Sequence, residues 1–111
     1  MPGPIRWTDL PEEPVNGLVT RRVFHTPAMT IIQLAYKQGG IVPLHHHVHA
    51  QVTMVESGSL RMEMNGESTI VRAGESLPVP SNVPHLAEAL EDSRVVEVFV
   101  PARTDWIEPK S

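Results

Sequence analysis

Short apolar and alternating segments, separated by turns, make up most of this chain. Residues 60–64 read Leu-Arg-Met-Glu-Met, and this alternation of apolar and charged residues is typical of a half-buried strand. Asn65-Gly66 follows directly, which is a strong signal for a tight hairpin. Turn residues recur about every 8–12 positions without a long helical period, so the pattern predicts an all-β antiparallel sandwich or barrel. Strands are expected at 17–26, 29–37, 51–56, 60–64, 68–72 and 95–100, with a stiff proline-dense segment at 78–84.

Composition narrows the class of protein. The 111 residues are enough for one domain with a single core, and there is no cysteine to form a disulfide or act as a nucleophile. The net charge of −4, without a stripe of Lys and Arg, argues against a nucleic-acid partner. No basic apolar leader opens the chain and no apolar run approaches the roughly 20 residues of a membrane span. We therefore expect a cytoplasmic protein that has no membrane partner.

Five of the six histidines lie at 45–49 and at 85, and histidine is the commonest metal ligand in proteins. His45 and His47 are two apart, so on a strand both imidazoles share one face, whereas on a helix they would lie about 200° apart. Gln51 would lie roughly 13 Å from His47 on a straight strand. The chain must therefore bend between Val48 and Ala50 if Gln51 is to join them. His85 follows a run fixed by prolines.

Three imidazoles and one amide oxygen would leave open positions on a metal ion for water or substrate. Because all four groups are neutral, the ion would keep its full charge, which favours an anionic ligand and a Lewis-acid role. Without further support, a solvated histidine loop is about as good an interpretation. His46 is expected to point to the opposite face and His25 to be structural. His49 could be a ligand, a group behind the ligands or a proton carrier at the rim of the site.

Two stretches resemble the paired motifs of the cupins. The stretch Gly39-x5-His45-x-His47-x3-Gln51-x6-Gly58 is similar to the first motif, which usually has Glu at the position of Gln51. The stretch Gly74-x5-Pro80-x-Asn82-x2-His85-x3-Ala89 is similar to the second motif, with Asn82 in place of the usual Gly and Ala89 in place of the usual Asn.

The resemblance implies a single cupin domain over residues 1–111, folded as a double-stranded β-helix (jelly-roll barrel). It also implies terminal arms at 1–15 and 104–111, which in barrels of this size often pack on a second subunit, and hence a homodimer. By the same resemblance, each chain would hold one divalent ion (Ni, Zn, Mn or Fe) through His45, His47, Gln51 and His85.

One subgroup of cupins is closer in motif than the rest: those that linearise 4,5-unsaturated uronates in pectin and alginate breakdown. They carry an acidic residue, a Phe and an Arg near the last strand, followed by a tail with Trp. Glu97-x-Phe99-x3-Arg103, with Asp105-Trp106, resembles that arrangement, although Glu97 stands where Asp is usual. The resemblance makes Glu97, Phe99 and Arg103 candidate catalytic residues.

The residues themselves are compatible with these roles. In 95–100, Glu97 and Phe99 share one strand face and the valines share the other. A carboxylate near a metal could move a proton, and Arg103 could clamp a substrate carboxylate. The alternative interpretation is that Glu97 is an exposed strand residue, Phe99 belongs to the core and Arg103 is a surface charge.

Three functions stay open at this point. The first is a metal-dependent enzyme that opens or tautomerises a small anionic sugar acid. The second is an oxygen-dependent cupin of the dioxygenase type. The third is a barrel without catalysis that binds a metal or small ligand, or serves as a sensor. Metal identity and substrate do not follow from the sequence, because imidazole and amide ligands accept several first-row ions.

Overall fold

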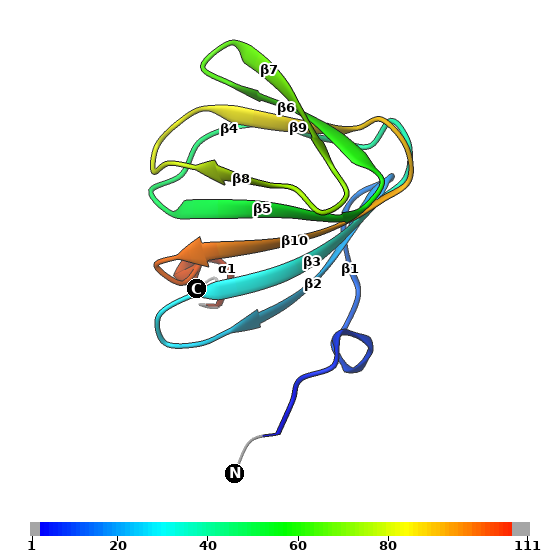
Figure 1. The fold of residues 1–111 in the computed structure, drawn as a ribbon. Helices are drawn as coiled ribbons and strands as arrows, with labels where there is room; N and C mark the ends of the chain where they lie inside the picture. The colour runs from blue at the N-terminus through cyan, green and yellow to red at the C-terminus, as the bar shows by residue number, and fades with distance from the viewer. Residues whose placement is uncertain (1–2, 108–111) are drawn as a thin grey trace.

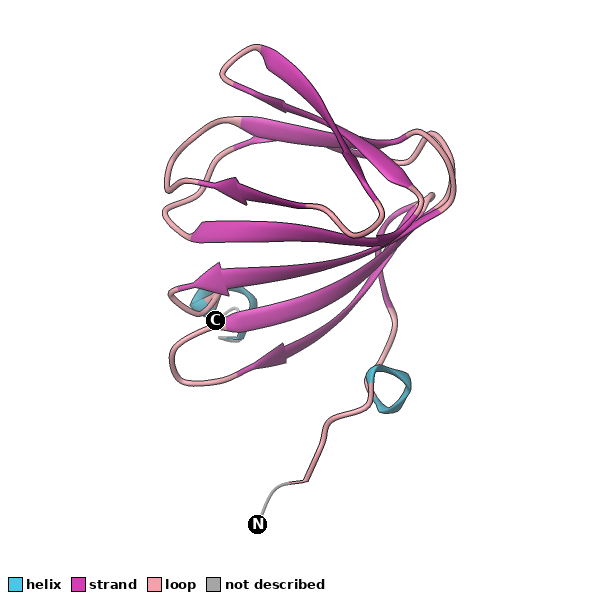
Figure 2. Ribbon diagram, in the orientation of Figure 1, coloured by secondary structure: helices cyan, strands magenta, loops and turns pink. Residues whose placement is uncertain are grey.

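The structure, a computed structural model, describes residues 3–107. Two antiparallel sheets face each other and form a jelly-roll barrel, which confirms the predicted fold class (Figures 1 and 2). The first sheet has the strand order β1 (Glu13–Asn16), β2 (Val19–His25), β3 (Thr30–Tyr36), β10 (Ser93–Val100), β5 (Ala50–Ser57) and β8 (Ser76–Val79). The second has the order β4 (Ile41–His45), β9 (His85–Ala89), β6 (Ser59–Met64) and β7 (Glu67–Arg72).

Six of these strands match the expected ranges to within a few residues, whereas β1, β4, β8 and β9 were not predicted. β4 and β8 each contain a proline, Pro43 and Pro78, and each lies at the edge of its sheet. Proline is tolerated there because an edge strand leaves some N–H groups unpaired. β9 has the sequence His-Leu-Ala-Glu-Ala, which lacks the β-branched residues that signal a strand.

The hydrophobic core lies between the two sheets. Its most buried members include Leu60, Met62 and Val95, which are 0%, 1% and 0% exposed. β10 is central in the first sheet and pairs with β3 on one side and β5 on the other. The inward residues of β10 therefore lie in the middle of the barrel, and this placement matters for the site.

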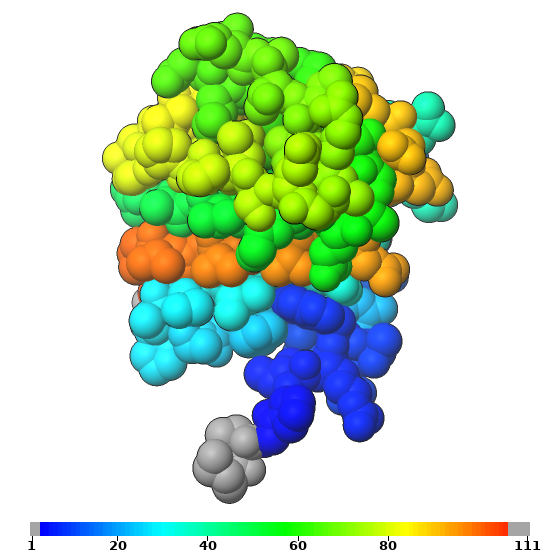
Figure 3. Space-filling model, in the orientation of Figure 1, coloured from blue at the N-terminus to red at the C-terminus, as the bar shows by residue number. Residues whose placement is uncertain are grey.

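The two ends of the described chain are attached differently. A 3₁₀ helix, η1 (Trp7–Asp9), is held by the Trp7 ring, 5.4 Å from that of Phe24, and by Arg22, which donates to two backbone carbonyls of this segment. The first of the described residues project away from the barrel (Figure 3). The short helix α1 (Thr104–Ile107) instead packs on the barrel through Trp106, whose ring lies 5.5 Å from that of Phe99. The rest of the predicted C-terminal arm lies outside the described residues, and none of the described helices is long and apolar enough to cross a bilayer.

Candidate metal centre and its cavity

Three histidines converge at one end of the barrel. His45 ends β4 and His85 begins β9, and the two residues are direct partners in the register of these strands. Their ring centroids are 4.3 Å apart, and the ring of His47 lies 5.3 Å from His45 and 5.0 Å from His85. One nitrogen from each ring lies within 4.8 Å of the other two. The expected strand geometry was wrong for His47, because β4 ends at His45 and His47 lies in the loop that bends toward β5.

Backbone carbonyls determine which nitrogen of each imidazole ring carries the proton. Nδ1 lies 2.7 Å from the Pro43 carbonyl in His45, 2.8 Å from the His49 carbonyl in His47 and 2.8 Å from the Val83 carbonyl in His85. A carbonyl only accepts, so each Nδ1 carries the proton and each neutral ring keeps a lone pair on Nε2. Ligating histidines are held in this way by their other ring nitrogen. Nε2 of His85 is buried and has no hydrogen-bond partner among the described residues.

Burial keeps two of these rings in the neutral form that can bind a metal. The pKa of His85 is lowered to about 4, chiefly by burial, with smaller contributions from the neighbouring His45, His47 and Arg103 and an opposing one from its hydrogen bond to the Val83 carbonyl. The pKa of His47 is also below its ordinary value, chiefly because of burial. A cluster of neutral imidazoles, rather than of imidazolium ions, is the state a divalent ion requires.

Gln51 on β5 completes this donor set. Its Oε1 lies 3.0 Å from Nε2 of His47, while its Nε2 donates to Thr53 Oγ1 at 3.0 Å and to Glu97 Oε2 at 3.2 Å. An amide oxygen and an unprotonated imidazole nitrogen are both acceptors, so this close approach favours a cation between them. The four groups therefore fit a divalent ion.

Gln51 also explains a departure from the usual cupin motif. A glutamate in its place would set a second carboxylate against Glu97, and two carboxylates sharing a site cannot both ionise easily. The amide offers an oxygen toward His47 and an N–H toward Glu97. The choice of Gln51 is thus matched to the acidic residue on β10, 46 positions away.

Glu97 lies on the inner face of β10, directly opposite Thr53 of β5. It is only 7% exposed, so the interpretation as an exposed strand residue was wrong. Burial raises its pKa to about 7, against the opposing effects of a 2.7 Å hydrogen bond from the Thr53 hydroxyl and of the charge on Arg103. A carboxyl group with a pKa near neutrality can both accept and donate a proton.

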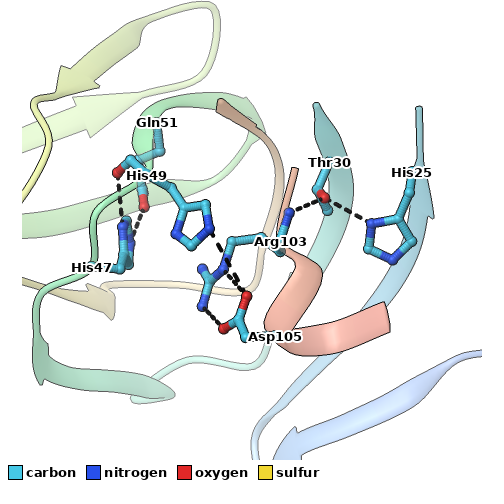
Figure 4. A network of polar contacts seen from close by, with 7 residues as sticks. All are labelled: His25, Thr30, His47, His49, Gln51, Arg103 and Asp105. Carbon is cyan, nitrogen blue, oxygen red and sulfur yellow. Dashed lines mark hydrogen bonds and ion pairs between the residues drawn. The ribbon is translucent and has the colours of Figure 1, made fainter. Parts of the chain in front are cut away.

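Arg103 is buried as well, which also contradicts its interpretation as a surface charge. Its Nε and Nη2 donate to the two carboxylate oxygens of Asp105 at 3.1 and 2.9 Å (Figure 4). Its guanidinium carbon lies 3.9 Å from the ring centroid of Trp106 and 5.0 Å from that of Phe99. Because Asp105 occupies one edge of the fork, a ligand would bind to the other edge, formed by the two Nη groups.

One cavity of about 290 Å³ lies between the sheets at this site. Its polar lining includes His45, His85, Gln51, Glu97 and Arg103. Much of the remaining wall is apolar and includes Ile32, Leu34, Met62 and Phe99, so Phe99 is both a core residue and a wall of the cavity. An apolar pocket with a few convergent polar groups is the usual form of a small-molecule site.

Sequence comparison agrees with this geometry, since the model of the cupin domain matches residues 33–101. The chain belongs to the cupin family. It is 26% identical over 98 residues to the pectin degradation protein KdgF of Dickeya dadantii (strain 3937), covering 86% of this cupin and 89% of that protein. The KdgF structure from Halomonas sp. has a TM-score of 0.83 at 28% identity and covers 89% and 94% of the two chains. A RmlC-like cupin from Shewanella frigidimarina NCIMB 400 has the same TM-score at 25% identity, with coverage of 89% and 90%.

The other histidines of this cupin take different places. His49 is buried but lies outside the group of three, with its Nε2 3.9 Å from Asp105 Oδ1 (Figure 4). His46 is exposed. Nδ1 of His25 is hydrogen-bonded to the Thr30 hydroxyl at 2.7 Å, and this hydroxyl oxygen also accepts the backbone N–H of Arg103 at 2.7 Å. His25 thus has the expected structural setting and supports the Arg103 segment.

Sequence reasoning missed three polar residues that line or support the cavity: Arg21, Tyr36 and Thr53. A signal existed for Arg21, because it shares the parity of Val19 and Val23 in a strand-like segment. A charge on the apolar face of a strand is a functional indication. Tyr36 and Thr53 carry no such signal, since both residue types are common in strands.

Proposed function

We propose that this cupin is a metal-dependent enzyme that opens the ring of a 4,5-unsaturated uronate and tautomerises the product. The observation that carries the proposal is the double contact of Gln51, which links the three histidines to a carboxyl group that titrates near neutrality. Two of these histidines, His45 and His85, line one cavity with the carboxyl group and Arg103. Metal, proton carrier and anion-binding residue are the components that such a reaction needs.

In this proposal His45, His47, His85 and Oε1 of Gln51 hold one divalent ion, with nickel, zinc, manganese and iron as candidates. When bound, the ion would supply Lewis acidity that polarises an oxygen of the substrate. The support is the chemistry of the donors: nitrogen lone pairs left free by the backbone hydrogen bonds, and an amide oxygen turned toward one of them.

The protein residues would then divide the remaining work. Arg103 binds the substrate carboxylate through its free Nη edge. Glu97 removes the proton from the C1 hydroxyl as the bond between C1 and the ring oxygen breaks, which leaves an aldehyde at C1 and an enol oxygen at C5. The same carboxyl group returns a proton to C4, which yields a ketone at C5. The reaction is a net isomerisation, so no other reactant is required.

Phe99 would exclude water from these groups and hold them in place. Its ring lies 5.6 Å from that of His47 and 5.0 Å from the guanidinium carbon of Arg103. The ring thus separates the metal ligands from the anion-binding residue by an apolar surface. Exclusion of water strengthens the electrostatic interactions on both sides of it.

The comparisons support the same substrate class. Two relatives are named KdgF, and one of these names includes pectin degradation. The motif Glu97-x-Phe99-x3-Arg103 resembles that of uronate-linearising cupins, and in this cupin its three side chains line the same cavity.

The test is turnover of 4,5-unsaturated galacturonate by the metal-loaded protein, followed as loss of the ultraviolet absorbance of the conjugated double bond. Wild-type protein should convert it. Glu97→Gln keeps the shape of the side chain but removes the proton carrier, so the rate should fall by about 10²–10⁴. Arg103→Ala should raise KM. Both variants should keep the metal content of the wild type, measured by elemental analysis.

Glu67→Gln is the matched control, because Glu67 is an exposed carboxylate at the far hairpin, and its rate should equal that of the wild type. Retention of the wild-type rate in Glu97→Gln would refute the role of Glu97. Failure of the metal-loaded wild type to convert the uronate would refute the reaction. Oxygen consumption or tight binding without a product would then decide between a dioxygenase and a binding barrel.

A further inference from the structure

An arginine that belongs to none of the motifs points into the same cavity. Arg21 on β2 pairs in register with Leu34 of β3, and both residues line the cavity. Its neighbours on that face of the strand are Val19 in the core and Val23 packed against it. The side chain of Arg21 is 25% exposed. A charge placed on an otherwise apolar inner face loses hydration, and such a cost is usually offset by a specific interaction.

Only part of the hydrogen-bonding capacity of Arg21 is used. Its Nε donates to Glu13 Oε1 at 2.9 Å, across the pair of strands β1 and β2. Its Nη groups have no hydrogen bond to a side chain or backbone atom of residues 3–107. Arg21 therefore resembles Arg103, since each guanidinium is anchored by one carboxylate and leaves its Nη edge for another group.

Both guanidinium groups lie on the same indole. The ring centroid of Trp106 is 4.1 Å from the Arg21 guanidinium carbon and 3.9 Å from that of Arg103. Contact with an aromatic ring fixes the orientation of an arginine and leaves its N–H groups free. The two guanidinium carbons therefore lie within about 8 Å of each other, on one aromatic ring. Electrostatic repulsion between them would be relieved by an anion.

We propose that Arg21 is a second anion-binding residue, which together with Arg103 binds the carboxylate of a sugar acid in this cavity. The inference rests on the proposed function for its substrate class and adds a specificity residue to it. Recognition by two guanidinium groups favours a sugar that carries a carboxylate over its neutral counterpart. Arg21 is a binding residue here and has no part in proton transfer.

The test compares Arg21→Met with Arg94→Met, each of which removes one positive charge. Arg94 is exposed on the outer face of β10 and does not line this cavity. The probe is D-galacturonate, bound to metal-loaded protein and measured by calorimetry. Arg21→Met should weaken binding at least about tenfold, because charge-assisted hydrogen bonds are lost. Arg94→Met should bind like the wild type, and Arg21→Lys should recover part of the loss.

A kinetic measurement separates binding from chemistry. With the unsaturated uronate, Arg21→Met should raise KM by a similar factor and change kcat less than twofold. Unchanged affinity and KM in Arg21→Met would overturn the proposal. A loss that Arg21→Lys does not recover and that is accompanied by loss of metal would also overturn it, because it would indicate a packing role for Arg21.

The two proposals fail in different ways. If the wild type binds galacturonate through Arg21 but does not convert the unsaturated uronate, the reaction is wrong and the anion site stands. If it converts the uronate and Arg21→Met behaves like the wild type, the reaction stands and the anion site is wrong. Absence of galacturonate binding by the wild type overturns the anion site.

Discussion

Strands β6 and β10 lie in opposite sheets and alternate with the same period, but they bury opposite kinds of residue at their centres. In β6 the inward residues Leu60 and Met62 are apolar and the charged Arg61 lies outside. In β10 the inward centre is the carboxyl group of Glu97, and the outward residues 94, 96, 98 and 100 are mostly valines. The inward face of β6 is apolar throughout, whereas that of β10 places a carboxyl group between the core residues Val95 and Phe99 and so contributes to the site.

The burial of the Glu97 carboxyl group is tolerated because this group has hydrogen-bond partners. Thr53 and Gln51 of the neighbouring strand both donate hydrogen bonds to it. Burial of a polar group is costly mainly when its hydrogen bonds are missing. On β6 no such donors face inward, since its inward residues pack against other apolar residues. The comparison therefore shows that a buried carboxyl group is tolerated in this barrel where the neighbouring strand supplies hydrogen-bond donors.

The largest effect should come from placing a charge on the inward face of β6. Leu60→Glu would bury a carboxyl group at a position that is 0% exposed, lies in the apolar core and does not line the cavity. The expected loss of unfolding free energy is about 4 kcal/mol or more, enough to unfold a domain of ordinary stability. The measurement is urea unfolding, or soluble yield if the protein does not fold.

Ile70→Glu introduces the same residue on β7, at a position 43% exposed, and should be tolerated. If Leu60→Glu were as stable as Ile70→Glu, the comparison of the two strands would be wrong. A carboxyl group would then be acceptable on the inward face of either strand, and the hydrogen bonds to Glu97 would not explain its burial.

The alternation of β6 and the hairpin after it show how much of the fold could be predicted from sequence. Asn65 and Gly66 have φ angles of 50° and 79°, as expected of a two-residue turn that joins antiparallel strands. Periodicity and turn residues are local, so these elements were accessible. β4 and β9 lack both signals, and their pairing depends on the closing of the second sheet.

The site residues also divide into those that local sequence could predict and those that depend on how the strands pair. The spacing of His45 and His47 and the bend before Gln51 could be inferred from local geometry, and His85 from the family motif. The contact between Gln51 and Glu97 could not, because it depends on the register of β5 against β10. The position of Arg21 on an apolar strand face was a local signal, but that this face lines the cavity depends on the closing of the barrel.

The next largest effect tests the match between Gln51 and Glu97. Gln51→Glu restores the usual cupin ligand but sets two carboxyl groups 3.2 Å apart, so one of them must hold a proton. Turnover of the unsaturated uronate should fall by about 10²-fold or more, because Glu97 no longer exchanges its proton freely. Metal content should be unchanged, since a carboxylate is also a ligand.

Gln38→Glu, in an exposed turn, is the matched control for the added charge. Full turnover in Gln51→Glu would mean that the amide is not needed beside Glu97. Loss of the metal would instead point to a change in the ligands, and elemental analysis separates the two results.

A smaller effect concerns the stability of the metal-free protein. The pKa of Glu97 is raised from 4.5 to about 7, so the folded state holds its proton where the unfolded state has lost it. The contribution of this group to stability is complete below about pH 4.5 and is lost as the pH rises to about 7, by about 3 kcal/mol at most. Urea unfolding at a series of pH values measures the loss.

Glu97→Gln is the reference for this measurement, because it lacks the titrating group and keeps the histidines. The neutral histidines contribute in the opposite direction, since the pKa of His85 is lowered to about 4, and this contribution cancels in the difference between the two proteins. A difference in unfolding free energy that stays constant from pH 4.5 to 7 would mean that Glu97 titrates normally.

The smallest effect is expected on the outer face of β6. Arg61 donates to Glu88 at 3.0 Å and to Glu63 at 3.2 Å, with its side chain 32% exposed. Arg61→Met keeps most of the apolar stem and should lower the unfolding free energy only slightly, because partly exposed ion pairs are screened by water and salt. Repeating the urea unfolding in 1 M salt should remove most of this difference. A loss as large as that of the core substitution on β6, persisting in salt, would mean that β6 also carries an essential charge and differs from β10 only in which face the charge occupies.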